Sequence, residues 1–266
     1  EFISDFAQND IMWPVSLAVD EQGSLYCTDE IKNKILKFNS EDHKVLEWGV
    51  EGSAKGELSK PAGIASDLEG HLYVVDAGNH RIQKFTNDGD FIHSWGEYGS
   101  DLGQLNDPWG VTIDLKGFVY VADWGNNRVQ KFTGNGEWLQ NFGMSFPEDL
   151  RLNHPSDVAV DSEGDVYVAD WGNKKVQIFD SDGEIITSLY GDDTELSRSA
   201  LEFMEVNEDY YKAFKRAKDK SRLGLFERPT SISITKDDRI VICDTARQRL
   251  QVYDKEKGYT EPQYNL

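Results

Sequence analysis

Trp109, Trp124 and Trp171 have the chemistry of ligand anchors, because an indole ring combines a large apolar face with one N–H donor. Trp124 and Trp171 lie in two nearly identical stretches, VYVADWGNNRVQKF (119–132) and VYVADWGNKKVQIF (166–179). Three such rings on one side of a protein could stack against a sugar ring or anchor a partner protein. The rings could equally pack between neighbouring structural units, and the sequence leaves both interpretations open.

Polar residues near these tryptophans extend the candidate binding set. Two asparagines follow the tryptophans in the same loops, one arginine begins the strand after the loop of Trp124, and a second arginine holds the same position one repeat earlier. The arginines would orient a ligand by charge, or they would pair with neighbouring aspartates in a structural role. The predicted binding residues are therefore Trp109, Trp124, Trp171, Asn126, Asn173, Arg81 and Arg128.

An alternative, catalytic interpretation rests on Asp107, His154 and Asp157. Carboxylates and an imidazole are the groups that a metal-assisted lyase or hydrolase would use. The five histidines show no ligand spacing of the His-x-His or His-x3-His kind, so the sequence predicts no metal-ligating set. We see no nucleophile or phosphate-loop motif either. The residues favour a non-enzymatic role, and an enzyme stays open as the alternative.

The elements that must position these residues are repeated units. Aspartates that end an apolar run stand at 29, 76, 123 and 170, a spacing of 47 residues, and a fifth stands at 244. Each unit holds four short segments rich in β-branched and aromatic residues, separated by turns of Gly, Asn and Asp. Four antiparallel strands in a repeat of about 40–50 residues are typical of a β-propeller blade.

The segment from Pro108 to Phe132, PWGVTIDLKGFVYVADWGNNRVQKF, resembles the NHL repeat, and NHR itself is spelled out at 79–81. The resemblance covers nearly the whole chain and implies an all-β propeller of NHL type, a single domain over residues 1–266. NHL propellers bind proteins, RNA or extracellular ligands, and related six-bladed propellers include lyases and lactonases, so the resemblance implies a fold and not a function. It also implies that the loops bearing the tryptophans share one face, around a central channel.

A carboxylate-rich channel mouth could hold Ca²⁺ through oxygen ligands. A net negative surface accounts for acidic loops without any ion, however. We therefore expect no cofactor, with Ca²⁺ at the channel left open.

Five repeats are in register, and residues 1–6, EFISDF, align with an outer strand. The chain therefore either closes five blades with its N-terminal strand or forms part of a six-bladed propeller. Because residue 1 is not Met, removal of a leader or an upstream blade stays open. A longer connection before the fifth repeat predicts one α-helical insertion at 192–227, on the tryptophan-bearing face.

The charge balance limits the classes of partner that the protein could bind. With 48 acidic and 28 basic residues the net charge is -20, which repels phosphate backbones and anionic lipids. No apolar run approaches the roughly 20 residues that span a bilayer, and no targeting segment is visible, so we expect a soluble protein in an unidentified compartment. The sequence thus predicts a non-enzymatic scaffold for a protein or carbohydrate ligand, without nucleic acid or membrane insertion.

Overall fold

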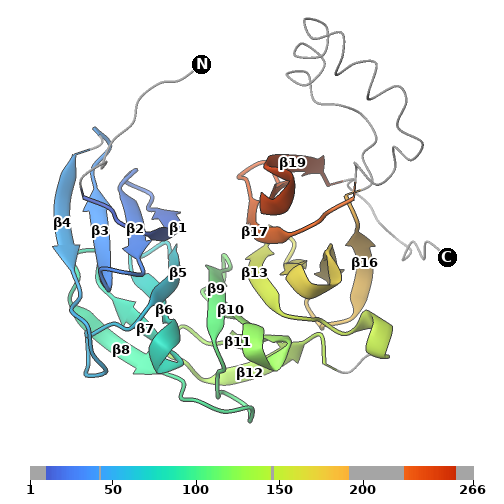
Figure 1. Cartoon of the computed structure of the whole chain (residues 1–266), viewed down its shortest axis with the longest axis horizontal. Helices are drawn as coiled ribbons and strands as arrows, with labels where there is room; N and C mark the ends of the chain where they lie inside the picture. Colours follow the sequence, from blue (N-terminus) through green and yellow to red (C-terminus); the bar gives the residue numbers. More distant parts are fainter. Residues whose placement is uncertain (1–9, 42, 145–146, 192–224, 256–266) are drawn as a thin grey trace, which may run out of the picture.

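The computed structural model describes residues 10–41, 43–144, 147–191 and 225–255, whose strands form five antiparallel sheets arranged in an arc around a central axis (Figure 1). Four sheets have four strands and the fifth has three in the described chain. From the axis outward, the strands are β1 (Pro14–Val19), β2 (Leu25–Asp29), β3 (Lys34–Phe38) and β4 (Lys44–Trp48); β5 (Pro61–Ser66), β6 (Leu72–Asp76), β7 (Arg81–Phe85) and β8 (Phe91–Trp95); β9 (Pro108–Ile113), β10 (Val119–Asp123), β11 (Arg128–Phe132) and β12 (Trp138–Phe142); β13 (Pro155–Val160), β14 (Val166–Asp170), β15 (Lys175–Phe179) and β16 (Ile185–Leu189); and β17 (Pro229–Ile234), β18 (Arg239–Asp244) and β19 (Arg249–Asp254). The predicted all-β propeller is confirmed, with five blades.

The core lies between consecutive blades. Alternate residues of each strand face opposite sides of its sheet, so every blade presents two apolar faces to its neighbours. Val119, Val121 and Phe132 of the third blade, for example, pack against Tyr73 and Ile82 of the second. The repeat spacing therefore produces the same apolar contact at successive seams.

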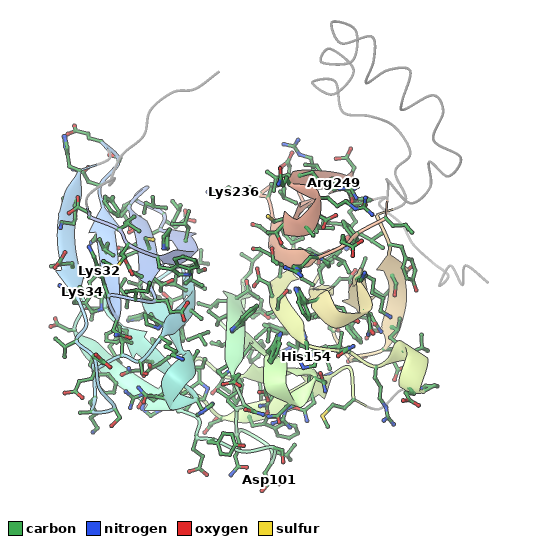
Figure 2. All side chains as sticks on the ribbon, in the orientation of Figure 1. Lys32, Lys34, Asp101, His154, Lys236 and Arg249 are labelled. Carbon is green, nitrogen blue, oxygen red and sulfur yellow. The ribbon has the colours of Figure 1, made fainter. Side chains whose placement is uncertain are left out.

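Each inner strand packs against the next, in the order β1, β5, β9, β13 and β17. No comparable packing joins β17 to β1 within the described residues, and the first and fifth blades flank this side of the molecule (Figure 1). Apolar side chains of β1 are exposed there, among them Leu17 and Val19. Lys236 of the fifth blade, labelled in Figure 2, lies with its Nζ 3.9 Å from Glu21 Oε1 of the first.

A buried aspartate at the end of each second strand holds the loops on one face. Asp123 accepts hydrogen bonds from the Asn106 N–H at 2.7 Å, from Asn126 Nδ2 at 2.9 Å and from Arg128 Nε at 2.7 Å. An aspartate that every repeat carries is expected to be structural, with its carboxylate accepting hydrogen bonds from the following turn. The structure adds a bond from the loop that enters the blade, so the aspartate ties two loops together.

The turn after this aspartate has nearly the same shape in successive blades. It is a short 3₁₀ turn: η1 (Ala77–Asn79), η2 (Trp124–Asn126), η4 (Trp171–Asn173) and η5 (Thr245–Arg247), with a further one, η3 (Glu148–Leu150), in another loop. The residue after the turn is left-handed, with φ of 53° at His80 and 55° at Asn127. We call the face that carries these turns the loop face.

Several sequence predictions fall wholly or partly outside the described residues. The N-terminal closing strand at 1–6 lies outside them. So does the predicted helical insertion at 192–227, except for residues 225–227, which are not helical. Cys27 and Cys243 are free thiols. In the described part of the chain, no helix is both long and apolar enough to cross a membrane.

Candidate functional site

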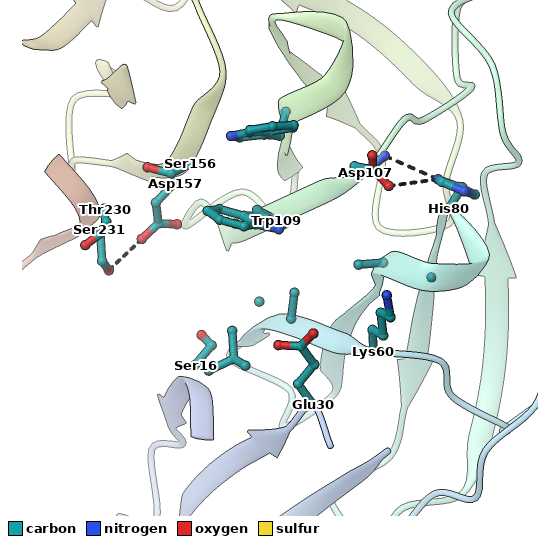
Figure 3. Close-up of a pocket in the computed structure, with 17 residues that line it drawn as sticks. Ser16, Glu30, Lys60, His80, Asp107, Trp109, Ser156, Asp157, Thr230 and Ser231 are labelled. Atoms are coloured by element: carbon teal, nitrogen blue, oxygen red, sulfur yellow. Dashed lines mark hydrogen bonds and ion pairs between the residues drawn. The ribbon is translucent and has the colours of Figure 1, made fainter. Parts of the chain in front are cut away.

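The inner strands and the loop face line an open cavity of about 670 Å³ on the central axis. Residues of all five blades line it, because the first residues of each inner strand point toward the axis. In Figure 3, Trp109 lies between Asp157 on one side and Asp107 on the other, with Glu30 and Lys60 facing it from the first two blades. A cavity of this size is in the range that holds small ligands.

A row of aromatic rings runs from this cavity across the loop face. Trp109 stacks on Trp124 with 5.7 Å between ring centroids and 29° between planes. His154 packs on Trp124 at 4.1 Å and on Trp171 at 6.4 Å. The Arg228 guanidinium ends the row, 5.6 Å from the Trp171 ring centroid. We call these five side chains the aromatic row.

Only part of the row reaches the cavity. Trp109 and Trp124 line it, whereas Trp171 and His154 do not. Of the two tryptophans that line the cavity, Trp109 is the more exposed, at 44%. The indole Nε1 of Trp124 is buried and has no hydrogen-bond partner within the described structure. The sequence-predicted tryptophans are therefore brought together, with two of the three at the cavity.

Asp157 lies at the seam between the fourth and fifth blades. Its Oδ2 accepts hydrogen bonds from Ser231 Oγ at 2.7 Å and the Ile232 N–H at 3.0 Å, and its Oδ1 accepts one from the Val158 N–H at 2.9 Å. Gly110 makes room for it, because a Cβ at Gly110 would stand 2.2 Å from Asp157 Oδ1. Burial raises the pKa of Asp157 to about 6, and the three hydrogen bonds partly oppose that rise.

Replacing Ser231 with alanine is expected to raise the pKa of Asp157 above about 6, because the lost hydrogen bond favours the ionised carboxylate. An acid with a raised pKa in the folded state holds its proton more tightly there. Its stabilising contribution is thus present below the unfolded pKa of about 4 and is lost as the pH rises through the folded value. The ¹³C NMR shift of the Asp157 side-chain carboxyl carbon, followed across this pH range, measures the change in pKa. An unchanged or lowered pKa in Ser231→Ala would contradict the assignment.

The other catalytic candidates are separated by the fold. Asp107 lines the cavity, and its backbone N–H donates to His80 Nδ1 at 3.2 Å. His154 lies at the junction of the third and fourth blades (Figure 2), with its Nδ1 2.6 Å from Asn153 Oδ1. Where the structure is described, Asp67, Glu69 and His71 form the one group of three that could hold a metal ion, on the turn between β5 and β6. The structure does not place Asp107, His154 and Asp157 in such a group.

The remaining predicted binding residues form hydrogen bonds that hold the loops in place. Asn126 donates to the Gly99 carbonyl at 2.8 Å as well as to Asp123, and Asn173 makes the equivalent bonds one blade further on. Arg128 is 1% exposed and donates to Asp123 and to the carbonyls of the loop before its blade. Arg81 repeats this arrangement in the second blade. None of the four residues lines the cavity.

Sequence reasoning missed three ionisable residues of the cavity wall, Glu30, Lys60 and His80. A signal was present, because Glu30 occupies the same repeat position as Trp124 and Lys60 the same position as Asp107. At these two repeat positions the candidates chosen from the sequence were Trp124 and Trp171, and Asp107 and His154. The repeat register, applied to all residue types, would have found the first two.

Sheets of four antiparallel strands set side by side around an axial cavity define a β-propeller. The family model of the NHL repeat matches residues 58–85, 105–132, 152–179 and 226–253. The chain is thus a β-propeller that carries four NHL repeats.

Solved structures share this fold at low identity. Selenomethionine-substituted virginiamycin B lyase from Staphylococcus aureus is 15% identical, with a TM-score of 0.59, over 94% of this chain and 72% of that one. A chain of the nidogen/laminin complex is 15% identical, with a TM-score of 0.57, over 91% of this chain and 80% of that one. A protein of unknown function from Bacteroides caccae is 12% identical, with a TM-score of 0.59, over 87% and 70%. No curated protein matches the sequence. At these identities the likeness shows the fold alone, and it includes both an enzyme and a protein complex.

Proposed function

We propose that this protein is a non-enzymatic scaffold that binds a ligand or partner protein at the axial cavity of its loop face. The observation that carries the proposal is Trp109, a large aromatic side chain left 44% exposed at a concave site. Binding pockets are concave and lined by aromatic side chains with a few polar groups, and buried tryptophans contribute strongly to binding energy. Trp109 would be the main anchor, supported from behind by Trp124.

The polar groups of the cavity support this role. Glu30, Lys60 and Asp107 line the cavity with Trp109, and their charged groups could pair with polar groups of a ligand. Asp157 already accepts three hydrogen bonds, which suits a fixed wall. The net charge of -20 supports partners other than nucleic acid or anionic membranes.

The test is indole NMR of the chain against a ligand panel of basic peptides, acidic peptides and neutral oligosaccharides. We expect one class to shift the Trp109 and Trp124 indole resonances and to be recovered chemically unchanged. Trp109→Ala should abolish that binding without lowering the melting temperature. Trp13→Ala is the matched control, since Trp13 is 58% exposed and does not line the cavity. Binding that persists in Trp109→Ala would overturn the proposal.

The second candidate is a metal-assisted lyase or hydrolase at the same cavity. The raised pKa of Asp157, to about 6, favours it, because a carboxyl that titrates near neutrality can exchange protons. Asp107 and Asp157 line the cavity and would supply oxygen ligands for Ca²⁺ in this case, whereas His154, the predicted imidazole, lies outside the cavity lining. If the protein converted a member of the panel to a product, and the Asp157→Asn variant did not, the result would support the enzyme and contradict the non-enzymatic scaffold.

A further inference from the structure

We propose that the cavity recognises a guanidinium group, presented as an arginine side chain of a partner protein and stacked on the face of Trp109. The inference rests on the proposed function and specifies the chemistry of its ligand. It is drawn from the arrangement of the aromatic row and from the charges that surround its open end.

The first observation is that the aromatic row already holds a guanidinium of its own. Arg228 lies over Trp171 at 5.6 Å, and it precedes Pro229, the first residue of the inner strand β17. The equivalent residue before the fourth blade is His154, which lies over Trp124. Each of these two tryptophans is thus covered by a nitrogen-bearing side chain from the following blade.

Trp109 is the member of the row that lacks such a cover. It is stacked on Trp124 by one face, it remains 44% exposed, and in the described chain neither Lys nor Arg lies over its ring. An arginine brought by a partner would complete the pattern that Arg228 makes at the other end. Guanidinium groups stack on indole faces more favourably than on other aromatic rings.

The second observation is the charge around Trp109. Three carboxylates, of Glu30, Asp107 and Asp157, line the cavity against one ammonium, of Lys60. The Asp107 side chain is 60% exposed, so its two oxygens are accessible for a bidentate pair with a guanidinium. His80 Nδ1 lies 3.9 Å from Asp107 Oδ1 and accepts the Asp107 N–H, which fixes the loop beneath that carboxylate.

Arginine fits these groups better than the other ligands of the same size. A neutral sugar could stack on Trp109 but would gain nothing from the carboxylates, and an anionic group would be repelled by them. A lysine ammonium is a compact, strongly hydrated charge that neither stacks nor pairs in a fork. The cavity of about 670 Å³ also exceeds one guanidinium, so neighbouring peptide residues have room.

The experiment uses the whole chain and an acetylated, amidated peptide with one arginine between glycines. Its counterpart carries citrulline, which keeps the shape and loses the charge. We expect the arginine peptide to shift the Trp109 indole resonance, and citrulline to weaken binding by about tenfold or more. Asp107→Asn should weaken arginine binding by a similar factor, and Trp109→Ala should abolish it. Trp13→Ala should leave it unchanged.

Other outcomes overturn the inference. If the citrulline peptide bound equally well, or if the arginine peptide still bound to Trp109→Ala, recognition of a guanidinium at this site would be contradicted. If free arginine amide bound as tightly as the peptide, the ligand would be a small molecule and not an arginine of a partner protein. A neutral oligosaccharide that binds in a Trp109-dependent way, while the arginine peptide does not, would overturn the inference and leave the proposed function standing. Circular dichroism melts of each variant show that loss of binding is not loss of fold.

Discussion

Replacing Arg128 with alanine is expected to lower the free energy of unfolding by about 3–5 kcal/mol, the range for breaking one partner of a buried ion pair. The substitution removes the 2.7 Å bond from Arg128 Nε to Asp123 and leaves that carboxylate buried at 0% exposure. It also removes the donors that hold the carbonyls of Ser100, Asp101 and Gln104. Denaturant unfolding, followed by tryptophan fluorescence, measures the loss.

The expected loss depends on pH in a defined direction. Burial raises the pKa of Asp123, and Arg128 is among the groups that oppose this rise. Without Arg128 the folded protein therefore holds a proton on Asp123 more tightly. The deficit of Arg128→Ala should shrink as the pH falls toward the ordinary range of the carboxyl and grow as the pH rises. Arg81→Ala is the control, with a smaller expected loss because the Arg81 side chain is 13% exposed. A deficit that is independent of pH would contradict the role of the pair.

Replacing Gly110 with alanine is expected to cost about 1–3 kcal/mol, the range for overpacking an interior. The new Cβ would stand 2.6 Å from the Asp157 Cα and 2.9 Å from the Ser156 carbonyl oxygen, both of them backbone atoms of the next inner strand. Strands β9 and β13 would have to separate, so we expect Asp157 to move and the cavity to change with it.

The control for this prediction is Gly134→Ala. A Cβ there meets the Tyr73 hydroxyl at 3.1 Å and the Gly117 carbonyl oxygen at 3.3 Å, so its neighbours need to move by only a few tenths of an ångström, far less than at Gly110. We expect a small change in unfolding free energy, and the difference between the two variants isolates the contact between inner strands. If both variants lost the same stability, close approach of β9 and β13 would not be the cause.

Much of the fold could be predicted because the same pattern of strands and turns occurs in every repeat. The spacing of 47 residues fixes the strand order of one unit, and each copy corroborates the others. Asp123 could be predicted to be structural because every unit carries its counterpart. The partner from the entering loop, the Asn106 N–H, could not, since it lies 17 residues away and depends on how the loops pack.

The candidate site was predicted in part. Trp109 and Trp124 line the cavity because the start of an inner strand and the end of a second strand both point to the axis. Trp171 occupies the same repeat position as Trp124, yet it lies beneath Arg228 and away from the cavity. The sequence gives the loop on which a side chain stands, but not which neighbouring side chain covers it. Asn126 and Arg128 illustrate this point, because their donors serve the Asp123 frame.

The near-identity of the turns after the buried aspartates has a consequence for the evolution of this surface. The positions at the start of η1, η2, η4 and η5 carry Ala77, Trp124, Trp171 and Thr245 on nearly superposable backbone. In the turns of Ala77, Trp124 and Trp171, the bonds that hold the turn come from the aspartate and the following asparagine and not from these side chains. Ala77 and Trp124 line the cavity, so a substitution at either position would change the cavity wall without removing a bond that holds the turn. Mutations that reshape the cavity wall and mutations that break the turn would therefore fall on different residues of the loop face.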